Sequence, residues 1–177
     1  FNPMNMGVSL LSKIIEMTIK QAFAVDKAGA SYAKSTGMGR EYDGLITDLT
    51  ESQKEFGVTS EDLQKSLAAL RTGLSQFNNL GDPTANNLTQ IVSGLQAIDV
   101  SADESTTTIR NLNKAFGMSE DAAGNMTREI ALSGKALGMS ASKITKEFNA
   151  SLGTLAVYGD RSVKIFTNIA AMAQTAG

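Results

Sequence analysis

The chain has 177 residues, of which 42% are hydrophobic and only 6% aromatic, and its 16 basic and 18 acidic residues leave a net charge of −2. This length suits one domain or two small ones around an aliphatic core, and the charge balance argues against a nucleic-acid binder held by bulk positive charge. The absence of Cys excludes disulfides and thiolate metal sites, and the absence of His removes the most common general base and metal ligand.

Residues 8–28 are predicted to form a helix that is apolar on nearly all sides, because its polar side chains share one narrow stripe. Such a helix is buried in its own domain, forms a seam between identical chains, or lies on or in a membrane. We expect symmetric self-association through it, with a trimer favoured. The side chains assigned to this contact are Leu10, Leu11, Ile14, Ile15, Ile19 and Phe23. The sequence has no run of 18 apolar residues, so no segment is expected to span a membrane unaided.

Glycines interrupt the helical pattern between residues 29 and 50, where we expect a hinge and the start of a short helix that runs to about Phe56. The Gly-Met-Gly-Arg run at 37–40 lacks the Gly-Lys-Ser/Thr ending of a phosphate-binding loop, so we assign it to the hinge. The sequence therefore divides into residues 1–50, an N-terminal apolar helix with a Gly-rich hinge, and residues 51–177, a helical-repeat domain.

A four-residue pattern of apolar, Gly, apolar and Ser or Thr recurs at 6–9, 56–59, 116–119 and 137–140. The Gly can close a helix in the left-handed conformation, the Ser or Thr can cap the next helix, and the apolar residue between them can pack against that helix. The pattern therefore stops one helix, turns the chain and starts another. The helix-breaking glycines of this pattern are Gly57, Gly117 and Gly138, and we add Gly81 and Gly159, which keep only the apolar-Gly start and are followed by Asp.

The spacing of these breaks indicates a repeat. Gly117, Gly138 and Gly159 are each 21 residues apart, which fits one helix of about four turns and a short connection. The segment 99–101 lacks the Gly of the pattern, and Asp160 stands at the cap position that follows Gly159. Ordinary helix caps would not need to be evenly spaced. The regular spacing therefore predicts an array of short helices.

Residues 60–78 give the clearest helical pattern. Thr59 and Asp62 are expected to form a capping box, and Val58 to pack against Leu63. The apolar stripe of this helix is assigned to the core, because it is too short for a coiled coil.

The later helices follow the same rules. Asp82 is expected at the cap of the next helix with Pro83 at its first position, and Ser101 with Glu104 at a second capping box. The inward faces are assigned to Leu88, Ile91, Val92, Leu95 and Ile98; to Ile109, Leu112 and Phe116; to Ala123, Met126, Ile130 and Leu137; to Ile144, Phe148, Leu152 and Leu155; and to Val163, Phe166, Ile169 and Ala173. We find no strand, and predict an all-α array or bundle of about seven or eight short helices joined by capped turns.

The sequence motifs predict no catalytic, cofactor or metal site. Residues 99–110 begin like a calcium loop, but Glu104 stands where the loop needs Gly and Arg110 where it needs Glu. Residues 51–52 match the Glu-Ser start of a lytic transglycosylase motif, but the Gly-Leu-Met-Gln run of such enzymes is absent. We therefore expect a protein that is not an enzyme and holds no cofactor.

The run at 56–70 and the successions at 116–126 and 137–144 resemble phage tail tape measure proteins, whose helical region repeats the same sequence of helix end, apolar-Gly-apolar-Ser and new helix start. The resemblance covers about residues 50–177. It implies a structural virion protein, made in the host cytoplasm, in the lumen or at the tip of a tail tube, where chain length sets tail length. Such a protein aids tail assembly, leaves the tube ahead of the DNA during genome ejection and helps the DNA cross the host envelope.

The resemblance further implies tail tube, tail tip or baseplate hub proteins as partners, possible host membrane contact during ejection, and no specific nucleic acid. It carries over no catalytic residue. Because no extended heptad repeat is present, we expect the length-measuring part to lie elsewhere in a longer chain. The alternative is a helical adaptor or baseplate-hub protein that stays in the particle, and a cell-wall hydrolase ranks third.

Overall fold

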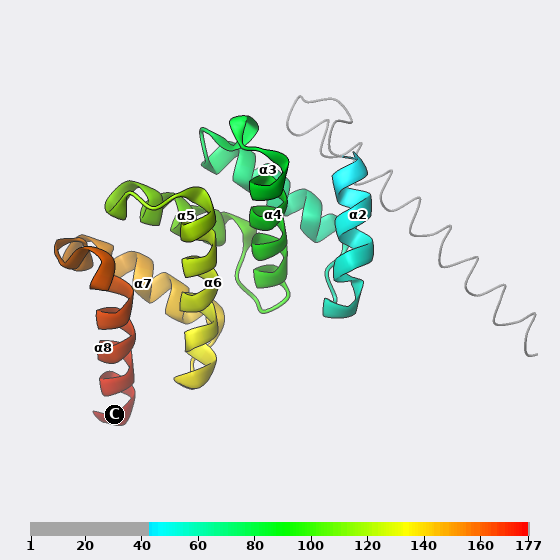
Figure 1. Cartoon of the computed structure of the whole chain (residues 1–177). Helices are drawn as coiled ribbons and strands as arrows, with labels where there is room; N and C mark the ends of the chain where they lie inside the picture. Colours follow the sequence, from blue (N-terminus) through cyan, green and yellow to red (C-terminus); the bar gives the residue numbers. More distant parts are fainter. Residues whose placement is uncertain (1–42, 177) are drawn as a thin grey trace, which may run out of the picture.

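The computed structural model describes residues 43–176, which form α-helices joined by turns and short 3-10 helices (Figure 1). The seven α-helices of this part are α2 (Asp43–Gln53), α3 (Ser60–Gly73), α4 (Asp82–Gln96), α5 (Ala102–Phe116), α6 (Glu120–Ala136), α7 (Ala141–Leu155) and α8 (Ser162–Ala176). The 3-10 helices are η1 (Lys54–Phe56), η2 (Phe77–Asn79) and η3 (Ala156–Arg161). Residues 43–176 contain no strand, so the all-α prediction is confirmed. The predicted helix at 8–28 and the pattern at 6–9 lie outside the described residues.

The helices form a two-layer array (Figure 1). Helices α2, α4, α6 and α8 stand side by side in one layer, and α3, α5 and α7 lie across them in the other. The main contacts join each helix to the next helix in the chain and to the next but one. Helix α2 crosses the predicted boundary at residue 50 and packs against α3 and α4. Every helix is therefore held by neighbours that are also close to it in sequence.

One apolar core runs through this array from α2 to α8. It starts at Ile46 on α2, passes through Leu67 on α3 and Ile109 on α5, and reaches Phe148 on α7 and Phe166 on α8. The apolar side chains of the helix predicted at 60–78 are all buried, although α3 ends at Gly73 and the last of them lies in η2: Leu63, Leu67, Leu70, Leu74 and Phe77. Those of α4 to α7 are buried or half-buried with one exception. Because burial of a large aliphatic side chain contributes about 1.5–3 kcal/mol, these stripes are the main source of stability.

Three predicted core assignments are wrong. Ile98 is 39% exposed because α4 ends at Gln96 and the chain has already turned. Ile169 is 52% exposed, and Ala173 is also exposed, although both belong to the apolar stripe of α8. Within residues 43–176, no further helix follows α8 to cover them.

Buried hydroxyl side chains lie among the apolar ones, and many bond to their own helix. The Thr89, Thr127 and Thr145 hydroxyls each donate to the carbonyl four residues earlier, at 2.7–2.8 Å. Ser66 on α3 and Thr108 on α5 make the same kind of bond. A buried hydroxyl with a partner avoids the cost of desolvation, so these positions add small side chains at interfaces without unpaired donors.

The predicted breaks at Gly117 and Gly138 have the expected left-handed backbone, with φ of 64° and 65°. The Gly117 amide donates to the Asn113 carbonyl at 2.9 Å, which closes α5 with a single bond. At the end of α6, the Gly138 amide donates to Lys135 and the Met139 amide to Gly134, the two bonds of a Schellman motif. Gly57 is also left-handed, with φ of 76°.

The Gly-less segment at 99–101 forms the same kind of break. Asp99 has φ of 66°, the only positive value at a non-Gly residue among the described residues. The Asp99 amide donates to Gln96 and the Val100 amide to Leu95, again as in a Schellman motif. Asp99 therefore takes the backbone conformation that Gly has at the other breaks.

The backbone angles of Gly81 and Gly159 differ from those of the other helix-breaking glycines. Gly81 is extended, with φ of −65° and ψ of 152°, and is itself the cap residue before α4. Asp82 is thus the first residue of α4, and its predicted place at the cap is wrong by one position. Gly159, with φ of 53° and ψ of −132°, lies inside η3 between α7 and α8.

The side-chain caps follow the sequence pattern closely. Thr59 and Asp62 form the predicted reciprocal capping box, and Val58 and Leu63 are buried in one cluster. The second predicted box is only half formed, because the Ser101 hydroxyl accepts from the Glu104 amide while the Glu104 carboxylate accepts from Ser142 on α7. The hydrogen bond between Glu104 and Ser142 across the helix interface therefore takes the place of the predicted bond from the Glu104 side chain to its own helix start.

Candidate binding grooves

The predicted site residues do not come together in one place. The six side chains assigned to self-association, which run from Leu10 to Phe23, lie outside the described residues. The helix-breaking glycines lie at successive turns along the array, one connection each. They therefore shape the backbone at separate turns and do not form a common site.

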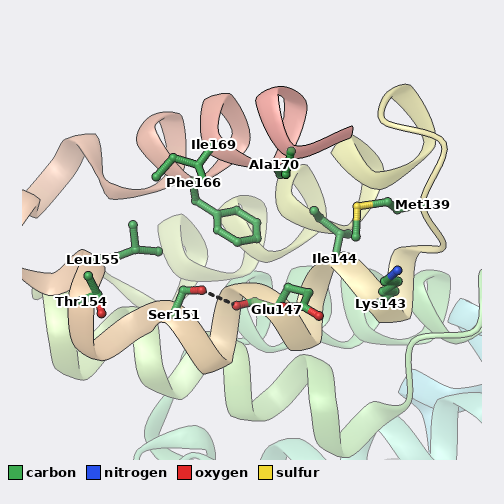
Figure 2. A pocket seen from close by; sticks show the side chains of 11 residues that line it. Met139, Lys143, Ile144, Glu147, Ser151, Thr154, Leu155, Phe166, Ile169 and Ala170 are labelled. Atoms are coloured by element: carbon green, nitrogen blue, oxygen red, sulfur yellow. Dashed lines mark hydrogen bonds between the residues drawn. The ribbon is translucent and has the colours of Figure 1, made fainter. Parts of the chain in front are cut away.

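The clearest hollow lies between α7 and α8 and has a volume of about 640 Å³. We call it the α7–α8 groove. It is lined by Met139, Lys143, Ile144, Glu147, Ser151, Thr154, Leu155, Phe166, Ile169, Ala170 and Ala173. Figure 2 shows the side chains of α8 on one side of this space and those of α7 on the other.

The floor of the α7–α8 groove is apolar and is formed by packed side chains. Ile144 and Leu155 are buried, and the Phe166 ring meets Phe148 edge to face, with ring centres 5.2 Å apart. Such aromatic pairs contribute about 0.5–1.5 kcal/mol beyond the area that they bury. The pair fixes α8 against α7, so the groove is held open by packed side chains and not by a loop.

The rim of the groove is polar along α7. Lys143 and Glu147 are exposed, one turn apart on the same face, and the Ser151 hydroxyl donates to the Glu147 carbonyl at 2.8 Å (Figure 2). The α8 side offers Ile169 and Ala170 instead. An apolar floor with two opposite charges on one edge suits an amphipathic partner better than a small polar ligand.

A second hollow, of about 670 Å³, lies beside the end of α4 among residues of α2, η1, α4 and α6. Its edge carries three exposed apolar side chains, Phe56 at 73%, Ile98 at 39% and Leu132 at 51% exposure. The buried Nε2 of Gln53 has no hydrogen-bond partner among the described residues, although the Gln53 Oε1 accepts from Ser93. Exposed apolar side chains gathered in this way are typical of contact surfaces.

The carboxyl group of Glu104 lies inside the α5–α7 interface. Burial raises the pKa of the Glu104 carboxyl, while the charge of Lys146 and the hydrogen bond from Ser142 act in the opposite direction. The Glu104 Oε2 accepts from the Ser142 hydroxyl at 3.3 Å, and the buried Oε1 has no partner among residues 43–176. This carboxylate faces a helix interface and lines neither groove, so its role is in packing.

Amide side chains complete the contact between α5 and α7. The Asn149 Nδ2 donates to the Thr108 hydroxyl at 2.7 Å, and the Asn149 Oδ1 accepts from Asn111 at 3.2 Å. In the other layer, both oxygens of Asp121 accept hydrogen bonds from α4. Polar residues are thus used mainly to set the register of one helix on another.

Among residues 43–176, no group of three or more acidic residues gathers in a way that could hold a metal ion. No helix of this part is both long and apolar enough to cross a bilayer.

Comparison with known proteins found no matching family model, no matching curated protein and no matching solved structure. Sequence reasoning found the caps and most of the core, but it found neither groove. The signal for the α7–α8 groove was present in the sequence, since the α8 stripe is complete, but nothing in the pattern says which stripe is covered.

Proposed function

We propose that this chain is a non-enzymatic structural component of a phage tail, similar to a tape measure protein and located in the tail tube lumen or at the tail tip. The observation that carries the proposal is the recurrent helix break, whose left-handed residue, apolar contact and capping hydroxyl all lie at helix ends. The tape measure family resembles this chain in that sequence pattern.

The use of polar side chains supports a role in assembly. Capping Ser and Thr hydroxyls bind helix starts, and Asn149 and Asp121 join neighbouring helices. Both grooves are lined mainly by apolar side chains. Such a molecule works through packing, and its proposed partners are copies of itself and proteins of the tail tube, tip or hub.

The proposal is tested by following the chain through infection. Quantitative mass spectrometry would compare purified particles of the encoding phage before and after the genome has been released in vitro. A tape-measure-like protein is expected in full particles and depleted from emptied ones, because it leaves the tube ahead of the DNA. A hub protein is expected in both, and absence from both would overturn a virion role.

A cell-wall assay separates the remaining alternative. Purified chain is expected to leave the turbidity of a peptidoglycan suspension unchanged over hours, while an added muramidase clears it. Clearing by the chain itself would replace the structural role by an enzymatic one.

A further inference from the structure

The α7–α8 groove occupies the position that one more helix of the array would fill. In the array, α5 lies against α3 and α4, and α7 lies against α5 and α6. A helix in the α7–α8 groove would lie against α7 and α8 in the same way. The exposed Ile169 belongs to the α8 stripe that such a helix would cover.

Hydrogen bonds between helices of one layer show how the incoming helix would be placed. Thr84, the third residue after the α4 cap, donates to Asp121, the second residue after the α6 cap, at 2.7 Å. Glu104, the third residue after the α5 cap, accepts from Ser142, the second residue after the α7 cap. In both layers, therefore, the third residue after the cap of one helix contacts the second residue after the cap of the next helix in that layer. The third residue after the α7 cap is Lys143, and it would meet the second residue of the incoming helix.

A second contact lies about one turn further along α5 and two turns further along α7. Asn149, the ninth residue after the α7 cap, donates to Thr108, the seventh residue after the α5 cap. The seventh residue after the α7 cap is Glu147. From the first contact to the second, the residue numbers increase along both α5 and α7, so these two helices are parallel. The incoming helix would likewise be parallel to α7.

We propose that the α7–α8 groove binds one amphipathic helix of a partner protein, parallel to α7. Its second residue after the cap is acidic and meets Lys143, and its ninth is basic or an amide and meets Glu147. Its apolar stripe rests on Phe166 and Ile169. The occupant is specified by continuity of the array and by the two charges on the rim, and this inference does not depend on the tail assignment.

The probe is a synthetic, fluorescently labelled peptide with residues 140–156 of this chain, which form α7 and its cap, carrying S142D and N149K. The α7 sequence is chosen because α7 fills the corresponding place on α5 and α6. The matched control peptide carries the opposite charges, S142K and N149D. Fluorescence anisotropy with the full 177-residue chain would measure both affinities.

The unmodified chain is expected to bind the first peptide about tenfold more tightly than the control, because two opposite-charge contacts become two like-charge contacts. In a chain with Lys143→Glu and Glu147→Lys, the preference of the two peptides is expected to reverse. Lys143 and Glu147 are both exposed, so exchanging their charges leaves the core unchanged. The expected reversal of the peptide preference therefore does not depend on a change in stability.

The apolar floor is tested by a matched pair of variants on α8. Ile169→Glu places a charge inside the groove and is expected to weaken binding by about tenfold or more. Met172→Glu changes a residue of the same helix that is 62% exposed and outside the groove lining, and is expected to leave binding unchanged. Circular dichroism would verify equal helix content.

Three results would overturn the proposal. They are no binding of the first peptide at about 1 mM, equal weakening by Ile169→Glu and Met172→Glu, and no reversal in the charge-exchanged chain. Two further results would also overturn it. Self-association that is removed by Ile169→Glu would assign the groove to a second copy, and tight binding of a peptide with residues 8–28 would assign it to this chain's own segment.

Discussion

A single backbone conformation decides where α4, α5 and α6 end. A residue one to three positions after the last residue of each helix has a positive φ: Asp99 after α4, Gly117 after α5 and Gly138 after α6. A side chain costs roughly 1–2 kcal/mol in the left-handed region, except that Asn and Asp tolerate it better. The three positions are therefore the sharpest tests of the fold at the level of single residues.

Asp99→Gly is expected to stabilise the chain by about 0.5–1 kcal/mol, because it removes the Cβ from a left-handed residue while increasing the entropy of the unfolded chain. Urea unfolding followed by circular dichroism measures the change. Asp103→Gly is the control: Asp103 lies in the first turn of α5, and its loss is expected to destabilise by about 1 kcal/mol. Equal signs for the two variants would contradict the left-handed assignment of Asp99.

Gly117→Val and Gly138→Val are each expected to destabilise by roughly 1–2 kcal/mol, because a β-branched residue is strained at positive φ. At both positions a Cβ would meet no atom within 4 Å, so the cost belongs to the backbone and not to a clash.

The control for both valine variants is Gly153→Ala, inside α7, where φ is helical and the space is open. This change is expected to stabilise by about 0.5–1 kcal/mol. Melting temperatures that are unchanged in both valine variants would remove the turn assignment.

At the scale of the helix, interfaces compete with local caps. Glu104 was predicted as part of a local box, but its carboxylate reaches across to Ser142 and is buried against α7. The pKa is raised because burial disfavours the charged form. The folded state therefore holds this proton more tightly than the unfolded state does.

This difference makes stability depend on pH. When the folded state binds more protons, the free energy of unfolding falls as pH rises through the usual range of the carboxyl group and up to its raised pKa. Glu104→Gln removes this contribution, so between about pH 4 and pH 7 the variant is expected to gain stability relative to the unmodified chain. Urea titrations at both pH values would measure the difference, and a difference that moves the other way would contradict the burial of Glu104.

The helices themselves were predictable to a large extent. The period of the apolar residues located the inward faces of α3 to α7, and the Ser and Thr caps located Thr59, Ser119 and Ser140. Caps and periodicity depend on residues within one or two turns, so they are visible in the sequence. The connection of α3 to α4 was not predicted, because it uses a 3-10 turn with a buried Phe77 and an extended Gly81 instead of the common pattern.

What the sequence did not reveal lies between the helices. The Glu104 contact, the exposure of Ile169 and both grooves depend on which helix covers which face. A complete apolar stripe predicts a buried face only if a neighbour is present. The α7–α8 groove is the place where residues 43–176 lack that neighbour.

At the scale of the whole molecule, contacts follow the chain. Because helices pack mainly on the next helix and the next but one, stability is expected to be a sum of neighbouring contributions, as in repeat proteins. In an array of this kind, the helices at one end can unfold while those at the other end stay folded. The apolar core that runs from α2 to α8 is continuous, but each part of it is formed by helices that are neighbours in the chain.

Hydrogen exchange measured by mass spectrometry on Phe166→Ala tests this local packing most directly. The substitution removes the ring that packs on Phe148 and costs about 3 kcal/mol or more at a core position. Exchange is expected to accelerate in α8 and in the α6 and α7 segments that contact it, while α2 to α4 keep the rates of the unmodified chain. Equal acceleration along the whole of residues 43–176 would contradict the array and indicate a single cooperative core.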